Sequence, residues 1–264
     1  MHDESPTGLQ SLLLQDLSGR AVGERARLDR DETRHARALR LEEGDAVALV
    51  DGHGTRRLGR LGPSSERERE VTLGELLPAP DPLPVELCVA VGNRTHALWL
   101  VEKAAELGIA GIQLLETERS ASVADAGRSA GFRRKAERRA LAAIKQSGGA
   151  WAPAIAAPVD LNAWLSAPGA PAGGVLLDPG GEPLAALLSG WDGRRAIRIL
   201  VGPEGGLTEP ERDACLEAGL RPARLGPTIL RFETAAVAAV AVAWQRREMA
   251  GDGPPVRTSA GGAR

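Results

Sequence analysis

The sequence has few cysteines and histidines, and this limits the chemistry that it can support. Its two cysteines, Cys88 and Cys215, have neither a metal-binding nor a redox spacing, and its four histidines form no HExxH or similar group. The sequence therefore indicates neither a disulfide framework nor a zinc centre, and we expect no metal site. This cysteine usage is typical of a reducing compartment.

Long apolar runs are also missing. The first residues, MHDESPTGLQ, contain no basic segment followed by an apolar one, and no run approaches the length of about 20 residues that crosses a membrane. We expect a cytoplasmic protein without membrane contact. The formal net charge of -2 argues against binding of nucleic acid through overall charge.

Positive charge is instead concentrated in one segment. From Arg119 to Lys145, eight lysines and arginines stand against two acidic residues, a surplus of six positive charges. Such a segment can contact phosphates, or it can be the solvated face of a helix. The charge alone does not separate the two interpretations.

A proline-rich stretch, LPAPDPLP at 77–84, predicts a domain boundary because its four prolines exclude a continuous helix or a central strand. Before it, one helix (31–41) and strands within 45–61 and 69–76 predict a small β-barrel-like domain over residues 1–77. After it, strands and helices alternate over 84–250, which predicts a parallel sheet with helices on its faces. Residues 251–264 are rich in glycine and proline and are predicted to be a disordered tail.

The alternation after residue 84 predicts individual elements. The predicted strands are 85–92, 109–116, 173–181, 194–202 and 222–226. The predicted helices are 95–108, a long basic helix that ends near 146, 182–189, 208–218 and 233–249. The helix start at 208 is the clearest of these, because Thr208 and Glu211 have the spacing of a capping box.

Three segments place proline and glycine directly after apolar residues: LLDPGG (176–181), LVGPEGG (200–206) and LGPTILRFETA (225–235). Ligands bind in α/β sheets at the carboxyl ends of strands, and glycine lets backbone amides approach them closely. The sequence contains neither GxGxxG nor GxxxxGK[ST]. We therefore predict a nucleotide-like ligand held mainly by backbone, in neither the Rossmann nor the P-loop arrangement.

Two of these segments carry a family resemblance. LVGPEGGLTEPE (200–211) and LGPTILRFETAAVAAV (225–240) resemble the two C-terminal motifs of the RsmE family, the 16S ribosomal RNA uracil-N3 methyltransferases of the SPOUT superfamily. The resemblance extends through residues 35–54, 102–120 and 146–153. It thus covers nearly the whole chain.

The resemblance implies an α/β fold, with an N-terminal PUA-like β-barrel that binds RNA and a C-terminal SPOUT-type, trefoil-knotted, parallel-sheet domain. S-adenosylmethionine would lie bent in the knot. The implied partners are a second copy of the chain, as a homodimer, and 16S rRNA, for which we expect a preference for the assembled small ribosomal subunit over free RNA. The implied cofactor-binding residues are Leu177, Leu200, Gly202, Glu204, Gly205, Gly206, Leu225, Gly226, Ile229, Leu230, Arg231 and Thr234.

The predicted catalytic residues follow from the chemistry of the uracil ring, whose N3 proton is mostly retained at neutral pH. Arg231 and Arg119 are predicted either to stabilise the N3 anion or to bind the target phosphate, because arginine stays charged and donates in a planar fork. Glu233 is either a base or a charge at a helix start, and we favour the second role.

The sequence departs from the family pattern at a few positions. Phe232 stands where a polar or small residue is expected, Lys145 where an acid is expected and Gly149 where arginine is expected. VGNRTHALWL (91–100) lacks a lysine. These departures bear on RNA contact more than on the reaction.

Three other functions stay open. A different SPOUT enzyme would methylate a ribose 2′-hydroxyl or another base position. A non-catalytic assembly factor would use only the barrel and the basic helix. A phosphate-handling hydrolase would require metal ligands, which are not clustered in this sequence.

Overall fold

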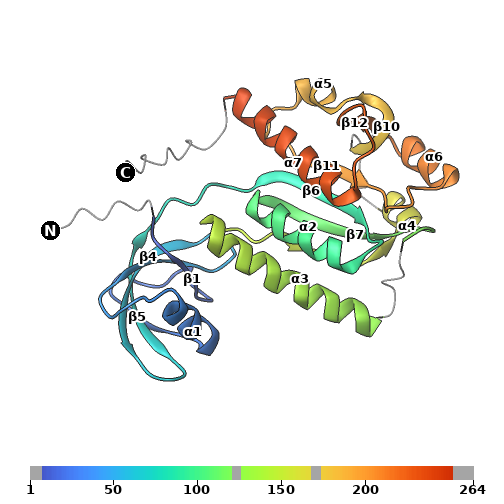
Figure 1. Cartoon of the computed structure of the whole chain (residues 1–264). Coiled ribbons are helices and arrows are strands. Elements are labelled where there is room, and N and C mark those ends of the chain that lie inside the picture. Colours follow the sequence, from blue (N-terminus) through green and yellow to red (C-terminus); the bar gives the residue numbers. More distant parts are fainter. Residues whose placement is uncertain (1–7, 121–125, 168–173, 252–264) are drawn as a thin grey trace. The chain divides into compact units, whose positions relative to one another are not determined.

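The computed structural model describes residues 8–120, 126–167 and 174–251, and the chain forms two compact units (Figure 1). The described part of the N-terminal unit consists of residues 8–81 and 141–152. The C-terminal unit contains the described residues from 82 to 140 and from 153 onward. Of the predicted tail at 251–264, Gly251 is described and residues 252–264 lie outside the described residues.

The N-terminal unit is a five-stranded, mostly antiparallel sheet with the strand order β1-β3-β4-β5-β2, in which only β1 and β3 run parallel. Apolar side chains alternate along the strands and meet in one core, which includes Leu12, Leu28, Leu49, Leu61 and Leu73. The elements are β1 (Ser11–Leu13), β2 (Arg25–Leu28), α1 (Arg30–Ala38), β3 (Ala46–Val50), β4 (Arg56–Ser64) and β5 (Arg69–Leu76).

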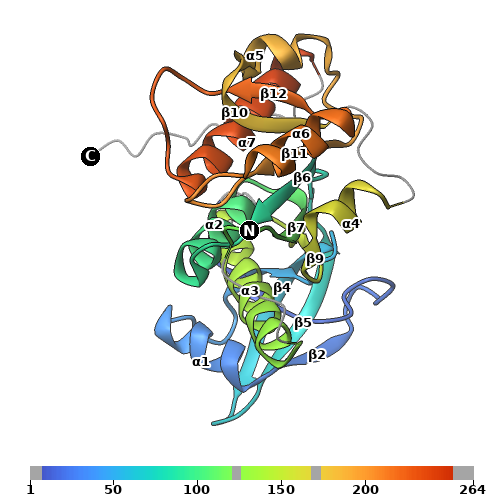
Figure 2. The ribbon, with the colours of Figure 1, turned by 90° about the vertical axis from the view of Figure 1, so that its right-hand side faces the viewer.

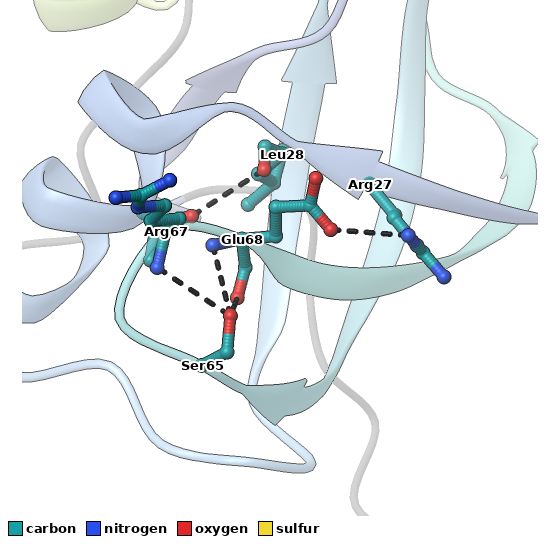
Figure 3. A network of polar contacts seen from close by, with 6 residues as sticks. Arg27, Leu28, Ser65, Arg67 and Glu68 are labelled. Atoms are coloured by element: carbon teal, nitrogen blue, oxygen red, sulfur yellow. Dashed lines mark hydrogen bonds and ion pairs between the residues drawn. The ribbon is translucent and has the colours of Figure 1, made fainter.

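The turn between β4 and β5 is closed by polar contacts (Figure 3). The Ser65 hydroxyl accepts hydrogen bonds from the backbone N–H groups of Arg67 at 3.4 Å and Glu68 at 3.1 Å. The Glu68 carboxylate pairs with Arg27 on β2 at 3.1 Å. The turn therefore helps to fix the register of three neighbouring strands.

Buried charges in the N-terminal unit are satisfied internally. Arg69 donates to the carbonyl oxygens of Leu41 at 2.7 Å and Gly62 at 3.4 Å. Glu32 accepts from the Leu13 N–H at 2.9 Å and forms an ion pair with Lys145. Lys145, where an acid was expected from the sequence, thus neutralises a buried carboxylate.

The C-terminal unit is a parallel sheet with the strand order β12-β10-β11-β6-β7-β8, and β9 also pairs with β7 (Figure 2). Every pairing in it is parallel. Its strands are β6 (Leu83–Ala90), β7 (Ile109–Glu116), β8 (Ala154–Ile155), β9 (Val159–Asp160), β10 (Val175–Pro183), β11 (Ile197–Val201) and β12 (Arg221–Arg224).

Helices cover both faces of this sheet. On one face α2 packs against α7, and the Trp244 indole N–H donates to the Leu107 carbonyl. On the other face α4 and α6 enclose an apolar cluster that contains Cys88, Leu200 and Cys215. The helices are α2 (Arg94–Glu106), α3 (Ala126–Ser147), α4 (Leu161–Leu165), α5 (Leu184–Leu187) with a 3-10 turn (Leu188–Gly190), α6 (Glu209–Glu217) and α7 (Phe232–Met249).

The predicted mixed α/β architecture is confirmed, with a mostly antiparallel N-terminal sheet and a parallel C-terminal sheet. Within the described ranges, no helix is both long and apolar enough to span a membrane.

Candidate active site at the carboxyl ends of the parallel strands

The three glycine- and proline-containing segments meet around one pocket of about 600 Å³ in the C-terminal unit. Its wall is formed by residues 176–179, 201–207, 223–226 and 228–232, together with Arg212 and Ala235. This volume lies within the range of about 300–1,000 Å³ that is common for small-molecule sites. The pocket is where parallel α/β sheets bind ligands, beyond the carboxyl ends of neighbouring strands.

Most of the predicted cofactor-binding residues line this pocket: Leu177, Gly202, Glu204, Gly205, Gly206, Leu225, Gly226, Ile229, Leu230 and Arg231. The other two predicted cofactor-binding residues, Leu200 and Thr234, are not part of the pocket wall. Leu200 is fully buried in the apolar cluster beneath α4 and α6, because alternate residues of β11 face opposite sides of the sheet. Thr234 is exposed in the first turn of α7.

Gly206 gives the β11–α6 loop its shape. It has a φ of 71°, and its N–H donates to the Pro203 carbonyl at 2.8 Å. A Cβ added at this position would meet nothing within 4 Å. The backbone conformation, rather than lack of space, therefore requires glycine here.

The predicted capping box follows this loop directly. The Glu211 carboxylate accepts from the Thr208 N–H at 2.8 Å, and α6 begins at Glu209. The box fixes where the loop ends and the helix begins.

An ion pair that the sequence analysis did not identify lies on the pocket wall. Arg212 Nε is 2.6 Å from Asp178 Oδ2, and the other Asp178 oxygen accepts from the Gly180 N–H at 2.7 Å. Burial opposes ionisation of Asp178, but the hydrogen bonds from Arg212 and Gly180 outweigh it and lower the pKa of this carboxyl group. Asp178 is therefore an anion on the pocket wall at neutral pH.

Glu204 lines the pocket, and its side chain reaches the residues that follow β6. Its Oε1 lies 3.6 Å from His96 Nδ1, and its carboxylate occupies the space that a side chain at Gly92 would fill. The His96 ring lies 6.3 Å from the ring of Phe232, which is buried and lines the pocket. Phe232 thus places an apolar ring on the pocket wall where a polar or small residue was expected. Neither Gly92 nor His96 carried a local sequence signal for this contact.

The three predicted catalytic residues occupy different positions. Arg231 is exposed at the N-cap of α7 and lines the pocket. Glu233 lies in the first turn of α7, and its Oε2 is buried without a hydrogen-bond partner. Arg119 lies outside the wall, and its guanidinium donates to the carbonyls of Gly205 at 3.0 Å and Leu207 at 3.4 Å.

The basic segment forms most of α3. Within it, Arg133, Arg134, Lys135, Arg138 and Arg139 are exposed. Arg133 pairs with Glu137 at 2.8 Å, and Arg139 pairs with Glu102 on α2 at 2.8 Å. The described side chains contain no group of three or more metal-binding residues.

Two family models match the chain. An RNA methyltransferase domain matches residues 79–244, and an RNA methyltransferase PUA domain matches residues 28–69. The boundary between the two matches falls near the proline-rich stretch.

Relatives agree with these models. The chain is 29% identical over 213 residues to ribosomal RNA small subunit methyltransferase E from Synechocystis. The matched region covers 78% of this chain and 67% of the relative. The crystal structure of ribosomal RNA small subunit methyltransferase E from Neisseria gonorrhoeae bound to S-adenosylmethionine superposes with a TM-score of 0.80 and 25% identity. It covers 90% of this chain and 97% of that chain.

A putative methyltransferase from Legionella pneumophila, solved with bound S-adenosylmethionine, has the same fold at a TM-score of 0.75 and 23% identity, covering 90% of this chain and 97% of that one. The resemblance to RsmE that the two C-terminal motifs indicated is confirmed. The chain belongs to the RNA methyltransferase family, with both its methyltransferase and its PUA domain.

Proposed function

We propose that this protein uses S-adenosylmethionine to methylate N3 of a uridine in the 16S rRNA of the small ribosomal subunit. The observation that carries the proposal is the pocket of about 600 Å³ built from three backbone-rich loops at the carboxyl ends of parallel strands. Family membership supports it, as do relatives named small subunit rRNA methyltransferases and similar structures bound to S-adenosylmethionine.

The residues of the pocket fit S-adenosylmethionine. Leu177, Leu225 and Leu230 offer an apolar surface for an adenine ring, and the backbone of Gly202–Gly206 offers donors and acceptors at close range. The Asp178 carboxylate, which is paired with Arg212, supplies acceptor oxygens that suit a cationic amino group. The bound cofactor would supply a methyl group already activated on a sulfonium.

The protein must then orient the uracil and favour loss of its N3 proton. Arg231 is exposed on the pocket wall, so its guanidinium can stabilise the developing N3 anion or hold the target phosphate. Glu233 lies in the first turn of α7, where a carboxylate stabilises the helix start. We therefore assign a role in catalysis to Arg231, and a role in stabilising the start of α7 to Glu233.

The exposed basic residues of α3 provide contacts to RNA phosphates. Such contacts carry no sequence information, so recognition of one uridine also requires shape. We therefore expect faster methylation of the assembled small subunit than of free 16S rRNA, and a cytoplasmic location. We also expect a homodimer, and a chain that threads the trefoil knot of SPOUT enzymes.

The reaction is tested on a strain that lacks this protein. Mass spectrometry of nucleosides from its small-subunit RNA should find 3-methyluridine missing, and the wild-type chain should restore it. Arg231→Ala should restore it about 10- to 100-fold more slowly, because one charged donor to the transition state is lost. Loss of a different methylated nucleoside would instead identify another SPOUT activity. An unchanged nucleoside profile, with no S-adenosylmethionine bound in calorimetry, would identify an assembly factor.

Assembly state and substrate form are tested separately. Light scattering coupled to size exclusion should give twice the chain mass at micromolar concentration, and a stable monomer would remove the dimer from the proposal. Methyl-transfer rates on free 16S rRNA and on small subunits should differ in favour of the subunit. Equal rates would contradict the expected preference.

A further inference from the structure

The turn that follows β7, Thr117–Ser120, is stabilised by hydrogen bonds between its first and last residues. The Thr117 N–H donates to the Ser120 hydroxyl at 2.9 Å, and the Ser120 N–H donates to the Thr117 carbonyl at 3.1 Å. Both ends of the turn are therefore fixed by hydrogen bonds. Arg119 extends from this turn, so its side chain starts from a well-defined backbone position.

The Arg119 guanidinium bridges the two sides of Gly206. Its Nη1 donates to the carbonyl oxygen of Gly205 at 3.0 Å and to that of Leu207 at 3.4 Å. Gly206, between these two carbonyls, has the left-handed φ that gives the β11–α6 loop its shape. One side chain from the turn after β7 thus holds the backbone on both sides of that residue.

A second contact joins the same turn to the end of the same loop. The Glu118 N–H donates to Glu211 Oε1 at 2.7 Å. The other Glu211 oxygen accepts from the N–H of Thr208 at 2.8 Å and from its hydroxyl at 3.1 Å. The Glu211 carboxylate therefore caps the start of α6 and also binds the turn after β7.

We propose that Arg119 is a positioning residue for the cofactor: it holds residues 202–207 in the shape that binds S-adenosylmethionine and does not act on the uracil itself. The inference rests on the proposed function, because it assumes that this loop binds S-adenosylmethionine. Its physical basis is that Arg119 already donates to two loop carbonyls and lies outside the pocket wall. Without it, the free loop would populate other shapes, and binding would carry the cost of ordering it.

The test measures S-adenosylmethionine affinity by calorimetry in the absence of RNA. Arg119→Ala should weaken binding by about five- to ten-fold, because the lost hydrogen bonds are charge-assisted but exposed to solvent. Arg119→Lys should recover part of this, since an ammonium can still donate to a carbonyl. Arg34→Ala is the matched control: it removes an exposed arginine that pairs with Asp31 on α1, and it should leave the affinity unchanged.

Kinetics separate positioning from catalysis. Arg119→Ala should raise the KM for S-adenosylmethionine and leave kcat near the wild-type value at saturating cofactor. Amide hydrogen exchange of residues 202–207 in the unliganded variant should be faster than in the wild type, because local opening becomes easier. Wild-type affinity in Arg119→Ala, or a lower kcat with an unchanged KM, would overturn the inference. Failure of the wild-type chain to bind S-adenosylmethionine would instead count against the proposed function.

Discussion

The two units use charged side chains in opposite ways. Among the described residues, every charged side chain that is buried lies in the N-terminal unit: Glu32, Asp51, Arg56, Arg57 and Arg69. In the C-terminal unit, Arg133, Arg134, Arg138 and Arg139 of α3 are exposed, as is Arg231, and the pocket wall is formed largely by backbone and apolar groups. Counting arginines along the sequence therefore does not locate the RNA-binding face, because burial and hydrogen-bond partners decide whether an arginine serves the fold or a ligand.

Arg69→Ala should give the largest change in stability. It removes two hydrogen bonds from a buried guanidinium to backbone carbonyls and leaves a cavity, so the free energy of unfolding should fall by about 2–4 kcal/mol. Chemical denaturation measures this, with Arg134→Ala on α3 as the control, which should change stability by less than about 0.5 kcal/mol. If both variants lost the same free energy of unfolding, the buried arginine would contribute no more to stability than the exposed one, and the contrast in charge use between the units would be wrong.

Gly206→Val should disable the site while leaving the fold of the C-terminal unit in place. Valine disfavours a φ of 71°, so the loop should change shape and S-adenosylmethionine affinity should fall by about 100-fold or more. Circular dichroism should stay close to that of the wild type. Gly206→Asn is the matched variant, because asparagine tolerates the left-handed region, and it should retain more affinity than valine. Wild-type cofactor binding by Gly206→Val would show that the loop shape is not required.

Neutralising two exposed arginines of α3, Arg134 and Arg138, should weaken RNA binding without affecting cofactor binding. Each phosphate contact that is lost should reduce the slope of log affinity against log salt by about 1. Titrations of small-subunit RNA at several salt concentrations measure the slope. If the slope of the double variant equals that of the wild type, α3 is only a solvated helix face.

Asp178 gives the smallest expected effect, because its partner Arg212 is partly exposed. Its pKa is lowered below the ordinary 3.8 in the folded protein, so its contribution to stability is fully present above that value. The contribution is lost as the pH falls through the lowered pKa. Melting temperatures of wild type and Asp178→Asn should therefore differ at neutral pH and converge below about pH 4. A difference that persists at low pH would assign the effect to packing.

Local signals predicted much of the C-terminal unit. The alternation of strands and helices, and the capping box at Thr208, led to elements that the structure contains, and the strand predicted at 109–116 has those bounds. The short elements β1, β2, β8, β9 and α4 were missed, because two to five residues are too few to show a period. Their formation depends on pairing or packing with distant segments.

In the pocket, too, features within one segment were predicted and contacts between distant segments were missed. Its glycine loops were recognisable because proline and glycine follow apolar runs, a signal within each segment. The pairing of Asp178 with Arg212, and the packing of Glu204 over Gly92, join residues far apart in the chain. Such pairs follow from strand order in the sheet, which a single sequence does not state.

Burial of both cysteines has a practical consequence. Cys88 and Cys215 are fully buried; burial raises the pKa of the Cys88 thiol well above its usual value and that of Cys215 to about 11. Because the thiolate is the reactive form, neither residue should react with maleimides at neutral pH while the protein is folded. The natural chain is therefore ready for single-site labelling. A cysteine introduced at Ile229, which is 87% exposed at the pocket edge, would carry a fluorophore that reports ligand arrival in real time.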